Sequence, residues 1–127
     1  MRLLIDSHVF LWMLFAPERL GARAVDAIDR ADAVSLSVAS LWELALKHAK
    51  GELPHAPGEL AEGVDELSLN ELPIRRRHLS MLNEIELPHG DPFDGMLVAQ
   101  ARVDSLTLVT ADRPLLASPY ATLDARR

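Results

Sequence analysis

The chain contains no cysteine among its 127 residues. A disulfide framework, a thiolate nucleophile and a zinc–thiolate site are therefore excluded. Long apolar runs are missing as well, because the longest one, residues 9–16, is much shorter than the about 20 residues that a membrane-spanning helix needs. An acid already stands at position 6 and no small-residue cleavage site follows, so we expect no signal peptide, no membrane association and a cytoplasmic location.

Glycine-rich phosphate loops and a G-x-S-x-G motif are also absent. Their absence argues against a nucleotide hydrolase, a dinucleotide-binding fold and an α/β-hydrolase. Lysine is scarce, with Lys47 and Lys50 as the only two, and the formal net charge is -6. Such a chain lacks the broad basic face of non-specific nucleic-acid binders. A nuclease is still compatible with this charge, because bound divalent cations reverse the field locally.

The length and the balance of 49% hydrophobic and 25% charged residues are typical of one globular domain, which we expect to span residues 1–127. Apolar periodicity predicts strands alternating with helices, which indicates βαβ units and a mostly parallel sheet. The strands are expected at residues 2–6, 34–37, 67–72, 106–110 and 122–124. The helices are expected at residues 8–15, 22–31, 37 or 40 to about 50, 59–67, 75–83, 92–103 and, as a short turn, 114–117.

Four acids that are far apart in the chain fall where a predicted strand ends or a predicted helix begins: Asp6, Glu43, Asp94 and Asp112. Ligands of open α/β sheets bind at the carboxyl ends of the strands, so these side chains are expected to meet at one rim. Carboxylate oxygens without cysteine favour a hard cation, Mg²⁺ or Mn²⁺. Such a cation polarises a phosphoryl oxygen and activates water.

Each acid also has an ordinary structural explanation. Asp6 ends a strand before a helix that Ser7 can cap, and Glu43 can pair with Lys47 four residues later. Asp112 suits a turn or a helix cap. Taken one at a time, these acids therefore do not distinguish a metal site from local structure.

The stretch around Asp94 has the clearest structural alternative. Residues 88–92 are predicted as a loop, in which Asp91 suits the N-cap of the following helix and Pro92 its first position. Capping explains Asp91 fully and Asp94 less fully, since one cap is enough. The five histidines show no metal-ligand spacing and are predicted to be surface or capping residues, and His89 is the one closest to these acids.

Four segments of the chain together resemble the successive motifs of PIN-domain proteins, with the best match to the VapC-type toxins of bacterial toxin–antitoxin systems. The resemblance covers essentially the whole chain, in the right order and spacing. The segments are residues 3–12 (LLIDSHVFLW), 40–45 (SLWELA), 89–101 (HGDPFDGMLVAQA) and 108–112 (LVTAD).

The resemblance implies a three-layer α/β/α fold with a parallel sheet and a Mg²⁺- or Mn²⁺-dependent endoribonuclease. Asp6, Glu43, Asp94 and Asp112 match the family's acidic positions, which implies that they hold one or two cations and position water for in-line attack on an RNA phosphodiester. Ser7 supplies the hydroxyl residue that commonly follows the first acid. The family also implies a cognate antitoxin and a homodimer, and the apolar helix at residues 9–15 is consistent with either a partner surface or core burial.

One position departs from the family pattern. Relatives with this Asp-Pro-Phe-Asp stretch often carry arginine next, where this chain has Gly95. Arg113 or residues 75–77 are then predicted to supply phosphate contacts in its place. Two further interpretations stay open: a catalytically silent PIN-domain binding module, and a structure-specific nuclease of the same fold.

Overall fold

A computed structural model of the chain describes residues 1–87 and 89–127. Pro88, at the start of the loop predicted for residues 88–92, lies outside the described residues. Five strands form one sheet in the order β3-β2-β1-β4-β5, and each neighbouring pair is parallel, which confirms the expected parallel sheet. The strands are β1 (Arg2–Ile5), β2 (Ala33–Ser37), β3 (Asn70–Leu72), β4 (Thr107–Thr110) and β5 (Thr122–Asp124).

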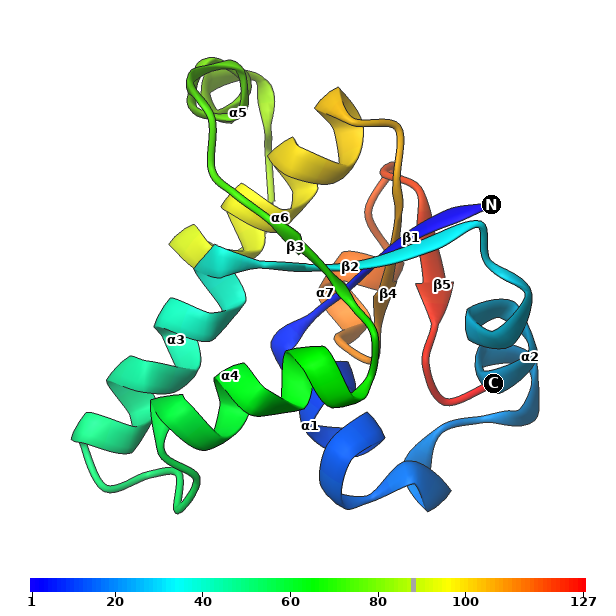
Figure 1. Ribbon diagram of the computed structural model, residues 1–127. Coiled ribbons are helices and arrows are strands. Elements are labelled where there is room, and N and C mark those ends of the chain that lie inside the picture. The colour runs from blue at the N-terminus through cyan, green and yellow to red at the C-terminus, as the bar shows by residue number, and fades with distance from the viewer. Residues whose placement is uncertain (88) are drawn as a thin grey trace.

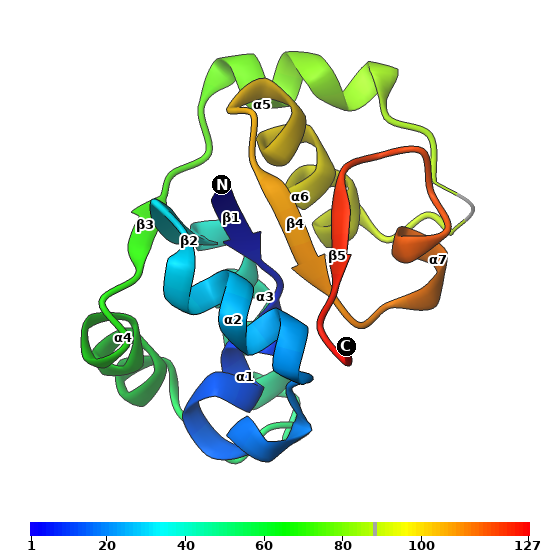
Figure 2. The same cartoon turned by 90° about the vertical axis from the view of Figure 1, so that its right-hand side faces the viewer.

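Successive strand residues point to opposite faces of the sheet and enter two separate cores. Leu3, Ile5 and Val109 are fully buried in one core, together with side chains from the helices on that face. Leu4 and Leu108 belong to the second core, together with side chains from the helices on the other face. Helices thus cover both faces, as Figures 1 and 2 show, and the three-layer α/β/α arrangement is confirmed. The helices are α1 (Ser7–Phe15), α2 (Ala22–Arg30), α3 (Val38–Ala49), α4 (Pro57–Glu66), α5 (Arg76–Met81), α6 (Pro92–Val103) and α7 (Arg113–Leu116), with 3-10 turns η1 (Pro17–Arg19) and η2 (Leu82–Glu84).

The largest departure from the sequence prediction concerns residues 67–72. Leu67 closes α4, and Ser68 adopts a left-handed φ of 53° that turns the chain, so β3 is limited to its last three residues. α4 also begins two residues earlier than expected, at Pro57, because proline fits the first helical turn. Neither difference alters the rim at which the acids were expected to meet.

The apolar helix α1 is partly a core element. Val9 and Phe10 are fully buried, which accounts for the first part of its apolar sequence. Phe15, at its end, is 44% exposed and stacks on His55 with ring centroids 3.7 Å apart. Within the part of the chain that the structure describes, no helix is both long enough and apolar enough to cross a membrane.

The strand order places a topological switch point between β1 and β4. From β1 the chain moves outward to β2 and β3 on one side, and it later fills β4 and β5 on the other. A crevice outside the carboxyl ends of the strands is expected at such a point. Asp6 directly follows β1, and its backbone N–H donates to the carbonyl of Val109 at 3.1 Å, so the two strand ends are held together there.

The C-terminal segment is fixed against the start of α2, where Figures 1 and 2 show the end of the chain. Gly21 N–H donates to the Ala125 carbonyl at 2.9 Å, and Arg23 N–H donates to the Arg127 carbonyl at 2.6 Å. A Cβ atom on Gly21 would overlap the backbone of Arg127. Glycine is therefore required here by the close approach of the two backbones, since its φ of -73° is ordinary.

Candidate metal centre

Asp6 is held rigidly at the junction of β1 and α1. It is the N-cap of α1: Oδ1 accepts from the Val9 N–H at 2.8 Å, while Oδ2 accepts from the Thr110 hydroxyl at 2.5 Å. Burial raises the pKa of its carboxyl, and the two hydrogen bonds act in the opposite direction. The prediction that Ser7 caps this helix is wrong, because Asp6 occupies the N-cap position and its side chain accepts from the Val9 N–H.

Ser7 instead holds Glu43. Its hydroxyl donates to Glu43 Oε1 at 2.6 Å, and the serine is buried. The predicted pair with Lys47 is present at the limit of an ion pair, with 4.0 Å between Nζ and Glu43 Oε2. The Glu43 side chain is only 15% exposed, so α3 directs it inward to the end of β1 rather than out to solvent.

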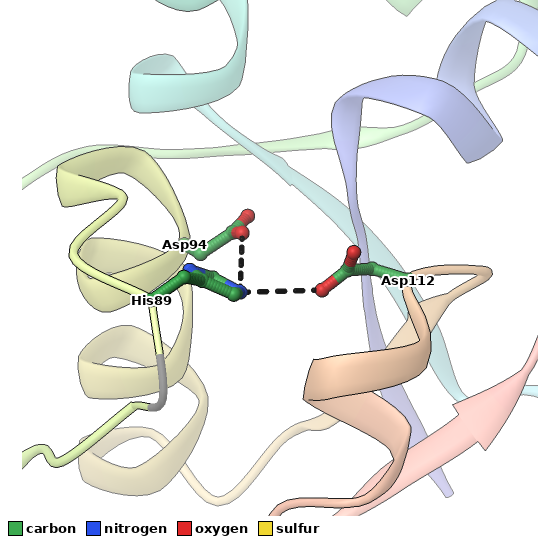
Figure 3. Close-up of side chains that lie close together, drawn as sticks. All are labelled: His89, Asp94 and Asp112. Carbon is green, nitrogen blue, oxygen red and sulfur yellow. Dashed lines mark hydrogen bonds and ion pairs between the residues drawn. The ribbon is translucent and has the colours of Figure 1, made fainter.

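Asp91 caps helix α6, so the carboxylate of Asp94 is not needed for capping. Asp91 Oδ1 accepts from the Phe93 N–H at 2.9 Å and from the Asp94 N–H at 3.3 Å, which confirms Asp91 as the N-cap of α6. Asp94 lies in the first turn, and no helix cap requires its carboxylate. The side chain extends from α6 toward α7, where Asp112 follows β4 (Figure 3).

The surroundings of Asp94 strongly raise the pKa of its carboxyl. Burial and the negative charges of Asp91, Asp112 and Glu43 raise its pKa from 3.8 to about 7, although His89 partly opposes the shift. Like charges within a few ångströms of one another disfavour ionisation. A carboxyl with this pKa is only half ionised at neutral pH, and a nearby divalent cation would favour its charged form.

His89 lies between two of the acids (Figure 3). Its Nε2 is 3.5 Å from Asp94 Oδ2 and 3.4 Å from Asp112 Oδ2. One ligand atom from each of these three residues lies within 4.8 Å of the other two, so the three could hold a metal ion. The sequence prediction of a surface or capping role missed this position. The only available signal was its proximity in sequence to Asp91.

Asp6 and Asp112 belong to the same site through Thr110. The Thr110 hydroxyl donates to Asp6 and accepts from the Asp112 N–H at 3.1 Å, and both acids line a hollow of about 190 Å³. Asp112 is also the N-cap of α7, where Oδ2 accepts from the Leu115 N–H at 3.2 Å. Its predicted role as a cap is confirmed, and this role coexists with its place beside the other acids.

The four predicted acids thus lie at one rim. The charge of Glu43 raises the pKa of both Asp6 and Asp94, and Asp112 acts on Asp94 in the same direction. Oxygen donors of this kind suit Mg²⁺ or Mn²⁺, and the histidine nitrogen is a donor that Mn²⁺ accepts more readily than Mg²⁺ does. His89, Asp94 and Asp112 therefore fit a divalent cation, while Asp6 and Glu43 lie at the same rim but outside this group of three. We refer to Asp6, Glu43, Asp94 and Asp112 as the four-acid cluster.

Comparison with known proteins defines the class to which this fold and site belong. The PIN-domain family profile matches residues 3–117. Ribonuclease VapC22 of Mycobacterium tuberculosis (strain ATCC 25618 / H37Rv) is 30% identical over 115 residues, which cover 88% of each chain. The chain belongs to the PIN-domain family.

Solved structures from Rickettsia felis and Neisseria gonorrhoeae have a similar fold. VapBC2 from Rickettsia felis, bound to a DNA fragment from its promoter, superposes with a TM-score of 0.70 at 13% identity over 98% of each chain. FitAcB from Neisseria gonorrhoeae superposes with a TM-score of 0.66 at 22% identity, also over 98% of each chain. At these identities the likeness concerns the fold, and it agrees with the three-layer parallel architecture described above.

Proposed function

We propose that this protein is a metal-dependent endoribonuclease that acts as the toxin of a toxin–antitoxin pair. The observation that carries the proposal is the four-acid cluster at the switch point between β1 and β4, where the pKa of Asp94 is raised to about 7. Carboxylates are gathered in this way where they bind divalent cations. The name of the similar mycobacterial protein, a ribonuclease, supports the choice of RNA as substrate.

The four-acid cluster would hold Mg²⁺ or Mn²⁺. When bound, such a cation polarises a phosphoryl oxygen and lowers the pKa of water. The remaining contacts keep the ligand groups in position. Ser7 orients Glu43 through a 2.6 Å hydrogen bond, and Thr110 orients Asp6. His89 Nε2 lies 3.5 Å from Asp94 Oδ2 and 3.4 Å from Asp112 Oδ2, where it would serve as a further ligand.

An exposed aromatic pair beside the cluster supports a single-stranded nucleic acid as substrate. Trp42 is 60% exposed, directly precedes Glu43 and contacts Phe93 edge-on, with ring centroids 5.3 Å apart. Phe93 in turn directly precedes Asp94. Unpaired bases stack on aromatic faces, whereas bases within a duplex are already stacked on each other.

The partner we infer is a cognate antitoxin. The similar solved structures include a toxin–antitoxin complex from Klebsiella pneumoniae and VapBC-5 from Mycobacterium tuberculosis, a member of a family of toxin–antitoxin systems. A cytoplasmic location, which the sequence predicts, and a homodimer, which the family resemblance implies, complete the proposal. The measurement that checks this proposal is co-purification of the chain with the product of an adjacent small reading frame, followed by loss of nuclease activity in the complex.

The decisive test of the catalytic proposal is cleavage of a single-stranded RNA by the wild-type chain and by Asp6→Asn and Asp94→Asn, with Mg²⁺ or Mn²⁺ and with EDTA. We expect metal-dependent cleavage by the wild type and a loss of at least about a hundredfold in both variants, as for removal of other electrostatic catalytic groups. Asp29→Asn makes the same chemical change on an exposed position of α2 and serves as the matched control. Wild-type rates in both site variants would rule out the four-acid cluster as the active site.

The same assay separates the alternatives. A chain that is stabilised by Mg²⁺ but cleaves no nucleic acid is a silent PIN-domain binding module. A chain that cleaves flap DNA and leaves single-stranded RNA intact is a structure-specific nuclease. Gly95 bears on the first alternative, and a Cβ at this position would face Leu82 of η2 at 3.9 Å.

A further inference from the structure

The hollow beside Asp6 and Asp112 is lined by an arginine as well as by acids. Its volume is about 190 Å³, and its lining combines two acids with histidine, tryptophan and arginine side chains. The lining residues are Asp6, His8, Trp12, Ala111, Asp112 and Arg126. The proposed function needs such cations, because a polyanion that approaches four carboxylates on a chain of net charge -6 is repelled until positive charge is placed beside them.

Arg126 is held in place by several groups. Its Nη1 donates to the Ala111 carbonyl at 2.8 Å, one residue before Asp112, and its guanidinium carbon lies 5.9 Å from the centroid of the Trp12 ring. Its backbone N–H donates to Asp124 Oδ1 at 2.9 Å. A guanidinium has five N–H donors in a planar fork, so this set of contacts leaves donors available on an oriented group.

The charges around Arg126 are of both signs. Asp6, Asp112 and His8 line the same hollow, and the charge of His8 lowers the pKa of Asp6. Neither acid forms an ion pair with Arg126 among the residues that the structure describes. The guanidinium is therefore not neutralised by the cluster next to which it lies.

We propose that Arg126 binds a backbone phosphate of the RNA next to the four-acid cluster, with Trp12 as the face on which the guanidinium rests. The proposal rests on the proposed ribonuclease function and adds a substrate-binding residue to it. Arginine matches a phosphate through two parallel N–H donors, and an aromatic face leaves those donors free to point away from the ring.

Of the arginines expected from the sequence to contact phosphate, Arg113 directly follows Asp112 at the start of α7, whereas residues 75–77 lie elsewhere. Residues 75–77 line a separate hollow together with Ile74, and Arg77 is already bonded to Asp104 at 3.2 and 3.3 Å. These arginines form the N-cap and first residues of α5, which Figures 1 and 2 show at the end of the molecule away from α1. Arg126 thus lies at the acids, whereas residues 75–77 lie on another part of the surface.

The test measures binding of a labelled single-stranded RNA to the full chain carrying Asp94→Asn, so that cleavage does not interfere. Affinity is determined at fixed Mg²⁺ over a series of NaCl concentrations. Arg126→Ala is expected to weaken binding about tenfold, the effect of losing one charge-assisted pair. It should also reduce the slope of log affinity against log salt by about 0.7, the value for one phosphate contact with a single strand.

Two further variants make the result specific. Arg126→Lys should restore the slope but only part of the affinity, because lysine keeps the charge and lacks the fork. Arg127→Ala removes a neighbouring arginine that is bonded to Asp124 at 3.7 Å, and it should leave both quantities unchanged.

The outcomes distinguish this inference from the function on which it rests. Unchanged affinity and slope in Arg126→Ala, with wild-type cleavage intact, would overturn the role of Arg126 alone. So would weaker binding that comes with a lower unfolding temperature, an unchanged slope and no recovery with lysine, because that pattern describes a structural contact to Ala111. Failure of the wild-type chain to bind or cleave RNA would overturn both proposals.

Discussion

Replacing Asp94 with asparagine should make the metal-free protein more stable at pH 8, although the residue belongs to the proposed active site. The reason is the burial of this carboxylate, together with repulsion by the charges of Asp91, Asp112 and Glu43, which raises the pKa of Asp94 to about 7. Asparagine has nearly the same shape and cannot ionise. The variant therefore loses the repulsion and keeps the packing.

The magnitude follows from the shift. A pKa that moves from 3.8 to about 7 corresponds to about 4 kcal/mol at about 1.4 kcal/mol per unit. The Asp94 side chain is 21% exposed and lies at an open rim, so solvent screening lowers this figure to about 2 kcal/mol. A gain of this size is easily resolved, because small domains have total stabilities of about 5–15 kcal/mol.

The sign of the pH dependence is fixed by linkage. Below about pH 4, Asp94 is protonated in both the folded and the unfolded chain, and wild type and variant have similar free energies of unfolding. As the pH rises, the unfolded chain releases its proton first, so the wild type loses stability until the folded pKa of about 7 is passed. The difference between the proteins should therefore grow from pH 4 to pH 7 and then remain constant.

The assay is urea unfolding of both proteins between pH 5 and pH 8, first in EDTA and then in excess Mg²⁺. Metal should reverse the order, because a cation at a hundred times its Kd stabilises the wild type by about 2.7 kcal/mol. The exposed variant Asp29→Asn should follow the wild type throughout. The reasoning fails if Asp94→Asn is no more stable than the wild type in EDTA at pH 8, or if the difference does not change with pH.

Three other substitutions test neighbouring features. Gly95→Ala should raise the free energy of unfolding by about 0.5–1 kcal/mol in urea, because the new Cβ meets only Leu82 at 3.9 Å and glycine is a poor helix former; a loss would contradict the described packing. His78→Ala should lower the free energy of unfolding by about 3 kcal/mol in the same assay, because this fully buried ring accepts from the Arg75 N–H through Nδ1 and donates to Asp104 Oδ2 at 3.0 Å. A loss below about 1 kcal/mol would show that these hydrogen bonds contribute little to stability. Trp42→Ala should weaken RNA binding by about tenfold with an unchanged salt slope, because stacking involves no phosphate; a change in the slope would contradict the stacking role.

The acids could be predicted from the sequence because their positions depend on topology. Short apolar strands that alternate with helices predict a parallel sheet, and the carboxyl ends of its strands share a rim. Asp6 and Asp112 follow strands that turned out to be neighbours, with Ile5 opposite Val109. An error of a few residues in where a strand begins, as for β3, leaves such a prediction intact, because an acid that follows the strand still lies at its carboxyl end.

Local hydrogen bonding was harder to predict because several polar groups compete for each donor. Asp6 and Ser7 are both good helix caps by type. The choice between them depends on Glu43, which occupies the Ser7 hydroxyl from a helix 36 residues away. His89 poses the same difficulty, since it approaches Asp94 and Asp112 only when α6 and α7 come together in the folded chain.

The cations of the site depend on tertiary contacts that no motif encodes. Arg126 lines the same hollow as Asp6 and Asp112 because β5, a strand of three residues, pairs with β4. The absence of a side chain at Gly21 also lets the backbone of Arg126 and Arg127 lie directly against the start of α2. In the sequence, the same arginine is one of two that end the chain and has no distinguishing pattern. The negative charge of the proposed metal site is thus set by strand order, while the positive charge proposed to bind substrate is set by how residues 122–127 dock. We therefore expect changes in that segment to alter substrate affinity without disturbing the four-acid cluster.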